Sequence, residues 1–254
     1  MPHIPAEPVG SATVHDLLHS DDDDDAVREA ARERLNTLWD AARTVMVPTD
    51  EWWGHEPSML RWDCCSPSAV KWLMSKPDGW KQLRGRRDDN GCYNAWETYA
   101  GELFDDPRLF DILFKEVAPA CGMDWPLTLY KRPLFHAELD QGYPLEFRVF
   151  VENHAVIGVS SYYPQRHLSG WDWLAHVVAG ATLQLVDACP AFTADYLCVA
   201  EPTEDLPCGW ALIECGPPHI VNPNPFQASA HPCCFPPGRV RGIALSRMEG
   251  ALNG

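Results

Sequence analysis

The sequence predicts an α+β protein with a mainly antiparallel sheet in its C-terminal half. Helical patterns of apolar residues dominate the first half, and after Asp124 short apolar runs separated by turn residues replace them. The chain has 254 residues, of which 46% are hydrophobic, enough for one large domain or two small lobes with a core. Because helices packed on antiparallel strands form α+β layers, this order of elements predicts that class.

Residues 1–47 are predicted to form an arm, an acidic run and a helix. We expect residues 1–19, which contain prolines and histidines, to be loosely ordered. Ser20 and five aspartates then precede a helical pattern that ends before Pro48, with apolar positions at Val27, Ala31, Leu35, Leu38, Trp39 and Ala42. Acidic residues at a helix start provide a cap and suit the helix dipole. Capping or a solvated acidic tail is therefore favoured over a cation site.

Residues 48–123 are predicted to form an N-terminal lobe. Residues 58–62 (SMLRW) are short and extended, and Ser66-Pro67 opens a helix, since proline is favoured in a first helical turn. Residues 107–120 have the spacing of an amphipathic helix. A basic group between these helices is expected to be a solvated loop, and it comprises Lys81, Arg84, Arg86 and Arg87.

Residues 124–230 are predicted to form a C-terminal lobe, and residues 231–254 a Pro-rich C-terminal segment. The lobe is expected to contain three strands, a helix and two strands, at residues 126–134, 146–153, 154–163, 171–189, 192–202 and 209–218. In the strand EFRVFVE, alternate side chains share a face, so Glu146, Arg148 and Phe150 lie together. Either the two charged residues form a weak ion pair at a sheet edge, or the sheet holds them in a site.

Composition argues against several function classes. The formal net charge of −16 argues against nonspecific nucleic-acid binding. No apolar run approaches the ~20 residues of a membrane-spanning helix. The N-terminus has no basic start followed by an apolar core, so we expect a cytoplasmic protein with no membrane partner. The ten cysteines are then expected to be reduced thiols. They match no zinc-binding pattern, and the nearest cluster is Cys208, Cys215, His219, His231, Cys233 and Cys234.

Five stretches, taken in their order along the chain, resemble a known family. They are residues 58–72 (SMLRWDCCSPSAVKW), 127–135 (LTLYKRPLF), 146–164 (EFRVFVENHAVIGVSSYYP), 192–199 (FTADYLCV) and 210–218 (WALIECGPP). They are similar to the ATP-grasp superfamily, and more closely to the cell-division-cycle-123 family and the related small ATP-grasp proteins of phage and bacteria. The match covers residues 58–72 and 124–220.

The resemblance implies an ATP-grasp-like fold of two lobes, with a nucleotide site between the lobes and with ATP and Mg²⁺ as cofactors. The implied metal ligands are Asp195 and Glu214. The implied nucleotide-binding residues are Lys131, Arg132, Glu146, Arg148 and Ser160, and the implied catalytic residues are Lys131 and Arg148. The residue types agree with this chemistry, because Mg²⁺ prefers carboxylate and phosphate oxygens and cationic side chains neutralise a triphosphate.

Alternatives stay open for single residues. Asp195 is also typical of a strand entry, whereas Glu214 directly follows the apolar run WALI, where a carboxylate without a partner would be costly. Lys131 and Arg132 are adjacent and point in opposite directions on a strand, so one of them is expected to reach the site. The family has an Asn two positions after its acidic residue, and this chain has Gly216 there. Glycine has no side-chain amide oxygen to offer a metal. The alternatives are therefore weaker ATP binding, the use of one metal, or lost catalysis.

The resemblance implies either an enzyme or a binding protein. We expect an ATP-grasp ligase, which activates a carboxylate as an acyl phosphate for attack by an amine or a similar nucleophile. Its acceptor would be a small molecule or a peptide. One alternative is a non-catalytic ATP-binding assembly factor or chaperone with a protein client, like the cell-division-cycle-123 family. Another is a degenerate ATP-grasp protein used for interaction. Nucleic acid is not an expected partner.

Overall fold

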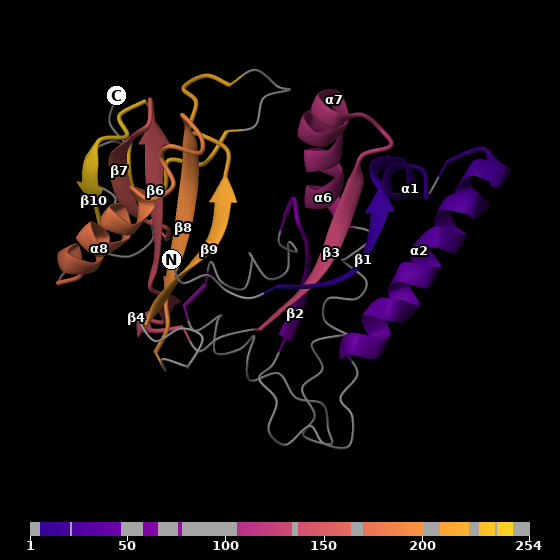
Figure 1. Cartoon of the computed structure of the whole chain (residues 1–254), viewed down its shortest axis with the longest axis horizontal. Coiled ribbons are helices and arrows are strands. Elements are labelled where there is room, and N and C mark those ends of the chain that lie inside the picture. The colour runs from indigo at the N-terminus through magenta and orange to yellow at the C-terminus, as the bar shows by residue number, and fades with distance from the viewer. Residues whose placement is uncertain are drawn as a thin grey trace. The chain divides into compact units, whose positions relative to one another are not determined.

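The chain divides into two compact units, Pro5–Phe135 and, together with Met1–Ile4, His136–Gly254. The computed structural model describes residues 6–20, 22–46, 58–65, 76–77, 106–133, 137–163, 170–200, 209–223, 229–236 and 238–245. Each unit has its own sheet and its own hydrophobic core (Figure 1). The predicted α+β class with mainly antiparallel strands is confirmed. Among the helices in the described ranges, none combines the length and the apolar character that a membrane span requires.

The N-terminal unit contains a three-stranded antiparallel sheet in the order β1-β3-β2. Its strands are β1 (Glu7–Thr13), β2 (Ser58–Trp62) and β3 (Pro126–Pro133). The sequence pattern predicts β3 as part of the C-terminal lobe, but this strand pairs with β1 on one side and β2 on the other. Its apolar residues Leu127 and Leu129 are buried in the N-terminal core, and the boundary between the units follows the strand.

Most of the N-terminal arm is ordered, which corrects the expectation for residues 1–19. After β1, a short helix α1 (Val14–Leu18) begins with a reciprocal capping box. The amide of Asp16 donates to Thr13 Oγ1 (3.1 Å), and the amide of Thr13 donates to Asp16 Oδ2 (3.0 Å). Val14 and Leu17 are fully buried, so burial of the arm's apolar side chains stabilises its order.

The predicted helix after the acidic run is confirmed as α2 (Asp25–Met46). Asp24 caps it, because its Oδ1 accepts a hydrogen bond from the amide of Ala26 (2.9 Å). The capping role expected for the acidic run is therefore confirmed. The apolar face of α2 enters the N-terminal core through Leu35, Leu38 and Ala42.

Residues 107–120 are helical, as predicted. They form three consecutive pieces: α6 (Pro107–Ile112), the π-helical η3 (Leu113–Val117) and α7 (Ala118–Cys121). Asp106 caps α6, since its Oδ1 accepts from the amide of Arg108 (2.8 Å). The helix predicted after Ser66 and the basic residues 81–87 lie outside the described residues.

The C-terminal unit contains a five-stranded sheet in the order β10-β7-β6-β8-β9, with β6 at its centre. Its strands are β6 (Glu146–Glu152), β7 (Ala155–Ser161), β8 (Phe192–Cys198), β9 (Trp210–Gly216) and β10 (Gly242–Ala244). All neighbours are antiparallel except β10 and β7, which are parallel. Strand β10 lies within the predicted Pro-rich C-terminal segment, so part of that segment is regular. Two short strands, β4 (Leu139–Asp140) and β5 (Tyr143–Pro144), form a separate pair.

Helix α8 (Asp172–Thr182) covers one face of this sheet (Figure 1). Leu174 and Val178 of the helix pack there against Phe147 and Val149 of β6. The helix is shorter than the predicted span 171–189. The amides of Gln184 and Leu185 bond to carbonyls three residues back, which gives a tighter turn. The other face of the sheet carries the alternate residues of β6.

A two-residue turn joins β6 and β7, so the two strands predicted at 146–153 and 154–163 form a hairpin. Asn153 and His154 adopt φ values of 51° and 60°. A two-residue hairpin turn of this kind requires positive φ at both central positions, and asparagine tolerates it better than most residues. The turn is also held to the chain before β8, because the amide of His154 donates to Pro190 O (2.9 Å).

Candidate functional site

Four of the predicted site residues form one row across the C-terminal sheet. Arg148 on β6 lies opposite Ser160 on β7 and opposite Asp195 on β8. Asp195 in turn lies opposite Glu214 on β9. Directly opposite residues of antiparallel strands project to the same face, with Cβ atoms about 5 Å apart. We call Ser160, Arg148, Asp195 and Glu214 the polar row.

A β-bulge brings Glu214 into the polar row. Tyr196 pairs with Leu212, and Asp195 then pairs with Glu214, so Ile213 is the extra residue on β9. Regular pairing would have put Ile213 opposite Asp195. The carboxylate therefore faces its neighbour only because the strand is locally irregular.

Arg148 and Asp195 form a buried two-point ion pair at the centre of the row. Arg148 Nε donates to Asp195 Oδ1 (2.7 Å), and Nη2 donates to Oδ2 (2.6 Å). Burial alone would lower the pKa of Arg148, but the Asp195 carboxylate outweighs it and raises that pKa well above its ordinary value. The guanidinium therefore stays charged and has a fixed orientation. The hydrogen bonds of Arg148 to a carboxylate therefore run across the strands, from β6 to Asp195 on β8.

Two further contacts fix Arg148. Its guanidinium carbon lies 4.8 Å from the centre of the Tyr162 ring, and Nη1 donates to the carbonyl of His231 (3.4 Å). Glu146, two residues before Arg148 on the same face, is fully buried and accepts a hydrogen bond from the Tyr163 hydroxyl (3.0 Å). Glu146 is therefore part of the support beneath the row.

The C-terminal segment from His231 to Cys234 lies against the β7 side of the row. The fully buried Ser160 hydroxyl accepts from the amide of Cys234 (2.9 Å) and is within donating distance of the Ser161 (2.9 Å) and Ala244 (3.2 Å) carbonyls. Burial raises the pKa of the neighbouring Cys233 thiol to about 12, so this thiol is neutral near pH 7. Ser160, predicted to bind a cofactor, holds the C-terminal segment in place here.

The donor set at Asp195 and Glu214 fits Mg²⁺ better than a metal held entirely by protein. No group of three or more His, Cys, Asp or Glu side chains that could hold a metal occurs in the described ranges. Mg²⁺ in nucleotide sites usually takes only one or two carboxylates and completes its shell with phosphates and waters. Each Asp195 oxygen accepts one hydrogen bond from Arg148, and a carboxylate oxygen has two lone pairs. Asp195 therefore retains acceptor capacity for a cation.

The structure explains the glycine at position 216. A Cβ atom on Gly216 would lie 2.9 Å from Thr193 Oγ1, closer than real Cβ contacts. Thr193 lies opposite Gly216 on β8, and its hydroxyl donates to Pro217 O (2.9 Å). An asparagine at position 216 would displace Thr193, so this strand pair accommodates glycine.

Lys131 and Arg132 lie on β3, in the sheet of the N-terminal unit, and are not part of the polar row. Lys131 pairs with Glu7 on β1 and Leu60 on β2, and Arg132 pairs with Met59. Their adjacent positions put them on opposite faces of that sheet, as expected.

Sequence reasoning missed several contacts of the row. The sequence gives no signal for the hydrogen bond from Tyr163 to Glu146, because this contact depends on how the chain turns after β7. The His231 contact uses a backbone carbonyl, which every residue has, so no residue type could have signalled it. The contact of the Tyr162 ring with Arg148 did have a signal in the sequence, because Tyr162 is an aromatic residue at the end of a predicted strand.

Comparisons with known proteins find structural neighbours among the solved structures. No family model matches the chain. No curated protein matches it either. Among solved structures it is similar to Cdc123 from Schizosaccharomyces pombe, with 15% identity, a TM-score of 0.49, and coverage of 97% of this chain and 90% of that one. It is also similar to a C-terminally truncated Cdc123 from the same organism, with 16% identity, a TM-score of 0.49, and coverage of 96% and 89%.

Proposed function

We propose that the chain binds Mg²⁺-ATP at the polar row, with Asp195 and Glu214 as the metal ligands. The observation that carries this proposal is the direct pairing of the two acidic residues across β8 and β9. Carboxylates placed directly opposite each other repel and destabilise a sheet. Arg148 pairs with Asp195. A divalent cation bound by the two carboxylates would offset their mutual repulsion and attract phosphate.

Each residue of the row has a distinct role in this proposal. Asp195 and Glu214 hold the metal, and Asp195 also fixes the orientation of Arg148. Bound Mg²⁺ supplies charge neutralisation between the phosphates. The pair with Asp195 and the Tyr162 ring hold Arg148 in one orientation, so it is placed in advance for an anionic ligand. The resemblance noted above also assigns phosphate contacts to Lys131 and Arg132, which belong to the other unit.

We propose binding without ligation as the primary activity. Gly216 offers no side-chain ligand to the metal, and Thr193 leaves no room for a side chain at that position. Transfer of a phosphoryl group depends on positioning and on neutralising the phosphates, so a metal with fewer protein ligands favours binding over turnover. In this form ATP acts as a ligand that stabilises one state of the protein, as an assembly factor with a protein client requires.

A thermal-shift titration with ATP, with and without Mg²⁺, tests the proposed site. A ligand that binds only the native state raises the melting temperature. We expect a Mg²⁺-dependent rise in the wild type that is lost in Glu214→Gln, which keeps the shape of the side chain and removes its charge. Asp187→Asn is the matched control, because it removes one exposed carboxylate of the same unit that lies outside the row. No rise at millimolar ATP in the wild type, or an equal rise in Glu214→Gln, would rule out this site.

A separate measurement distinguishes binding from ligation. Wild-type protein that shows the Mg²⁺-dependent shift is incubated with ATP and panels of carboxylate and amine acceptors, and ADP is measured. We expect no ADP above the level of the Glu214→Gln variant. ADP formation that depends on both Glu214 and an acceptor would establish a ligase instead.

A further inference from the structure

A cavity of about 690 Å³ lies in the C-terminal unit, on the same face of the sheet as the polar row. Phe150 lines it, and Phe150 follows Arg148 by two residues on β6. The remaining walls come from the end of β6, from β7, from the chain just before β8, from the chain that follows β9 and from the segment that leads into β10. Its volume lies within the range of about 300–1,000 Å³ typical of small-molecule sites.

The floor of the cavity is apolar and held in place by packing. Phe150 and Val240 are buried. The Phe150 ring makes edge contacts with His219 (6.3 Å between centroids) and with Phe235 (5.7 Å). His219 is itself fixed, because its Nδ1 lies 2.7 Å from Ala230 O. A floor held by ring contacts from two chain segments is preformed and gains little new order when a ligand binds.

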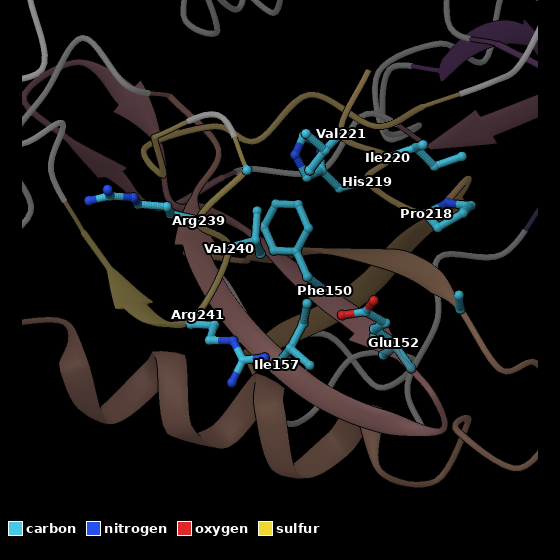
Figure 2. A pocket seen from close by; sticks show the side chains of 13 residues that line it. Phe150, Glu152, Ile157, Pro218, His219, Ile220, Val221, Arg239, Val240 and Arg241 are labelled. Atoms are coloured by element: carbon cyan, nitrogen blue, oxygen red, sulfur yellow. The ribbon is translucent and has the colours of Figure 1, made fainter. Parts of the chain in front are cut away.

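Charged residues stand on opposite sides of the cavity. Arg239 and Arg241 lie on one side, and Glu152 lies on the other (Figure 2). All three are exposed, and none forms a hydrogen bond or ion pair through its side chain with another residue in the described ranges. In a chain with a formal charge of −16, two neighbouring arginines without an acidic partner form a local positive site.

We propose that this cavity binds a small organic anion with an apolar body. The apolar part would lie on Phe150 and Val240, and a carboxylate, sulfonate or phosphate group would meet Arg239 and Arg241. Guanidinium groups suit such anions because their N–H groups match paired oxygen atoms. Glu152 repels the anionic group from the opposite side and so fixes which way the ligand lies. The proposal is independent of nucleotide binding, because no residue of the polar row lines the cavity.

Two fluorescent probes of nearly the same shape test the proposal on the full chain. 1-Anilinonaphthalene-8-sulfonate carries the anionic group, and N-phenyl-1-naphthylamine lacks it. Both fluoresce strongly when bound to apolar surface. We expect saturable one-site binding of the sulfonate probe. The double variant Arg239→Gln/Arg241→Gln should weaken that binding by about tenfold and change binding of the neutral probe by less than about twofold.

Two further variants complete the test. Glu152→Gln removes the repulsive charge and is expected to leave sulfonate binding unchanged or to tighten it. Ile157→Trp fills one wall and is expected to weaken both probes. The proposal is overturned by non-saturable binding of the sulfonate probe, by unchanged sulfonate affinity in the double arginine variant, or by equal weakening of both probes in that variant. The arginines are exposed, so their replacement tests the charge without disturbing the core.

Discussion

Arg148 and Asp195 carry opposite charges deep in the C-terminal unit, and this pairing determines what each can do. The two side chains are 11% and 3% exposed, so both have lost most of their hydration. Their two short hydrogen bonds offset that loss. Removing one partner leaves the other charge buried alone, which is far more costly than the net stabilisation from the intact pair.

Replacing one member of this pair should strongly destabilise the protein. We expect Asp195→Asn and Arg148→Met each to lower the free energy of unfolding by about 3–5 kcal/mol. The double variant Arg148→Met/Asp195→Asn should cost less than the sum of the two, because no buried charge is then left alone. Urea unfolding of the four proteins provides the double-mutant cycle.

The exposed pair between Lys115 and Asp111 is the control for this cycle. These side chains are about half exposed, and Lys115→Met should change stability by less than about 1 kcal/mol. If Arg148→Met and Asp195→Asn each lowered the free energy of unfolding by as little as Lys115→Met, water would have to reach the pair.

Asp16 gives the N-terminal unit a pH-dependent contribution to stability. Burial would raise the pKa of its carboxyl, but the hydrogen bond from Arg34 and those from the backbone and side chain of Thr13 outweigh burial and lower that pKa. A carboxyl whose pKa is lower in the folded state stabilises the fold above its unfolded pKa of about 3.9. This stabilisation is lost as the pH falls through the folded pKa.

Replacing Asp16 with asparagine should remove this pH dependence. At pH 7 we expect Asp16→Asn to cost about 1 kcal/mol, since it weakens the capping box and breaks the bond to Arg34. The difference from the wild type should shrink below about pH 4, because the carboxyl of the unfolded wild type takes up a proton there before that of the folded protein does. Urea unfolding between pH 3 and pH 7 measures it. A difference that stays constant across this range would contradict an ionised Asp16 in the folded state.

At the scale of the elements, alternation along β6 predicted which residues share a face, but strand pairing decided what they face. Arg148 and Phe150 lie on one face, as the pattern indicated. The bulge that turns Glu214 toward Asp195 leaves no mark in the sequence, because it depends on the pairing of β8 with β9. The placement of β3 was missed for a similar reason. Its first partner, β1, precedes it by more than one hundred residues, and pairing over such distances is not encoded locally.

Gly158 sets how closely the C-terminal segment packs against β7. A Cβ atom there would lie 3.0 Å from Phe235 Cζ and 3.2 Å from Val240 Cγ1. We expect Gly158→Ala to push this segment outward and to destabilise the protein by about 1–3 kcal/mol. The amide of Cys234, which donates to Ser160, should then exchange its hydrogen faster.

Two variants separate crowding from the general effect of adding a methyl group. Phe235→Leu in the Gly158→Ala background should recover part of the lost stability by making room. Gly180 is an exposed position of α8 where a Cβ atom would meet nothing within 4 Å, so Gly180→Ala should stabilise by up to about 1 kcal/mol through helix propensity. Unchanged exchange at Cys234 in Gly158→Ala would show that the segment does not depend on this contact.

At the scale of the whole molecule, the chain contains two separately built cores. The N-terminal core joins α2 to the β1-β3-β2 sheet, and the C-terminal core joins α8 to the five-stranded sheet. Each core is built from residues of its own unit. Strand β3, which was predicted for the C-terminal lobe, completes the sheet of the N-terminal unit. Chains of this kind often depart from two-state unfolding, because each core can open separately.

Matched core truncations should therefore act on different unfolding transitions. Leu129 in the N-terminal core and Leu145 in the C-terminal core are both fully buried, so each leucine-to-alanine change should cost about 2–5 kcal/mol. In calorimetry we expect two overlapping transitions, with Leu129→Ala lowering the midpoint of one and Leu145→Ala that of the other. A single transition lowered equally by both variants would mean that the units unfold together. The coupling free energy between the cores would then be comparable to the stability of either unit. In that case a ligand bound to the C-terminal sheet would stabilise the N-terminal unit as well.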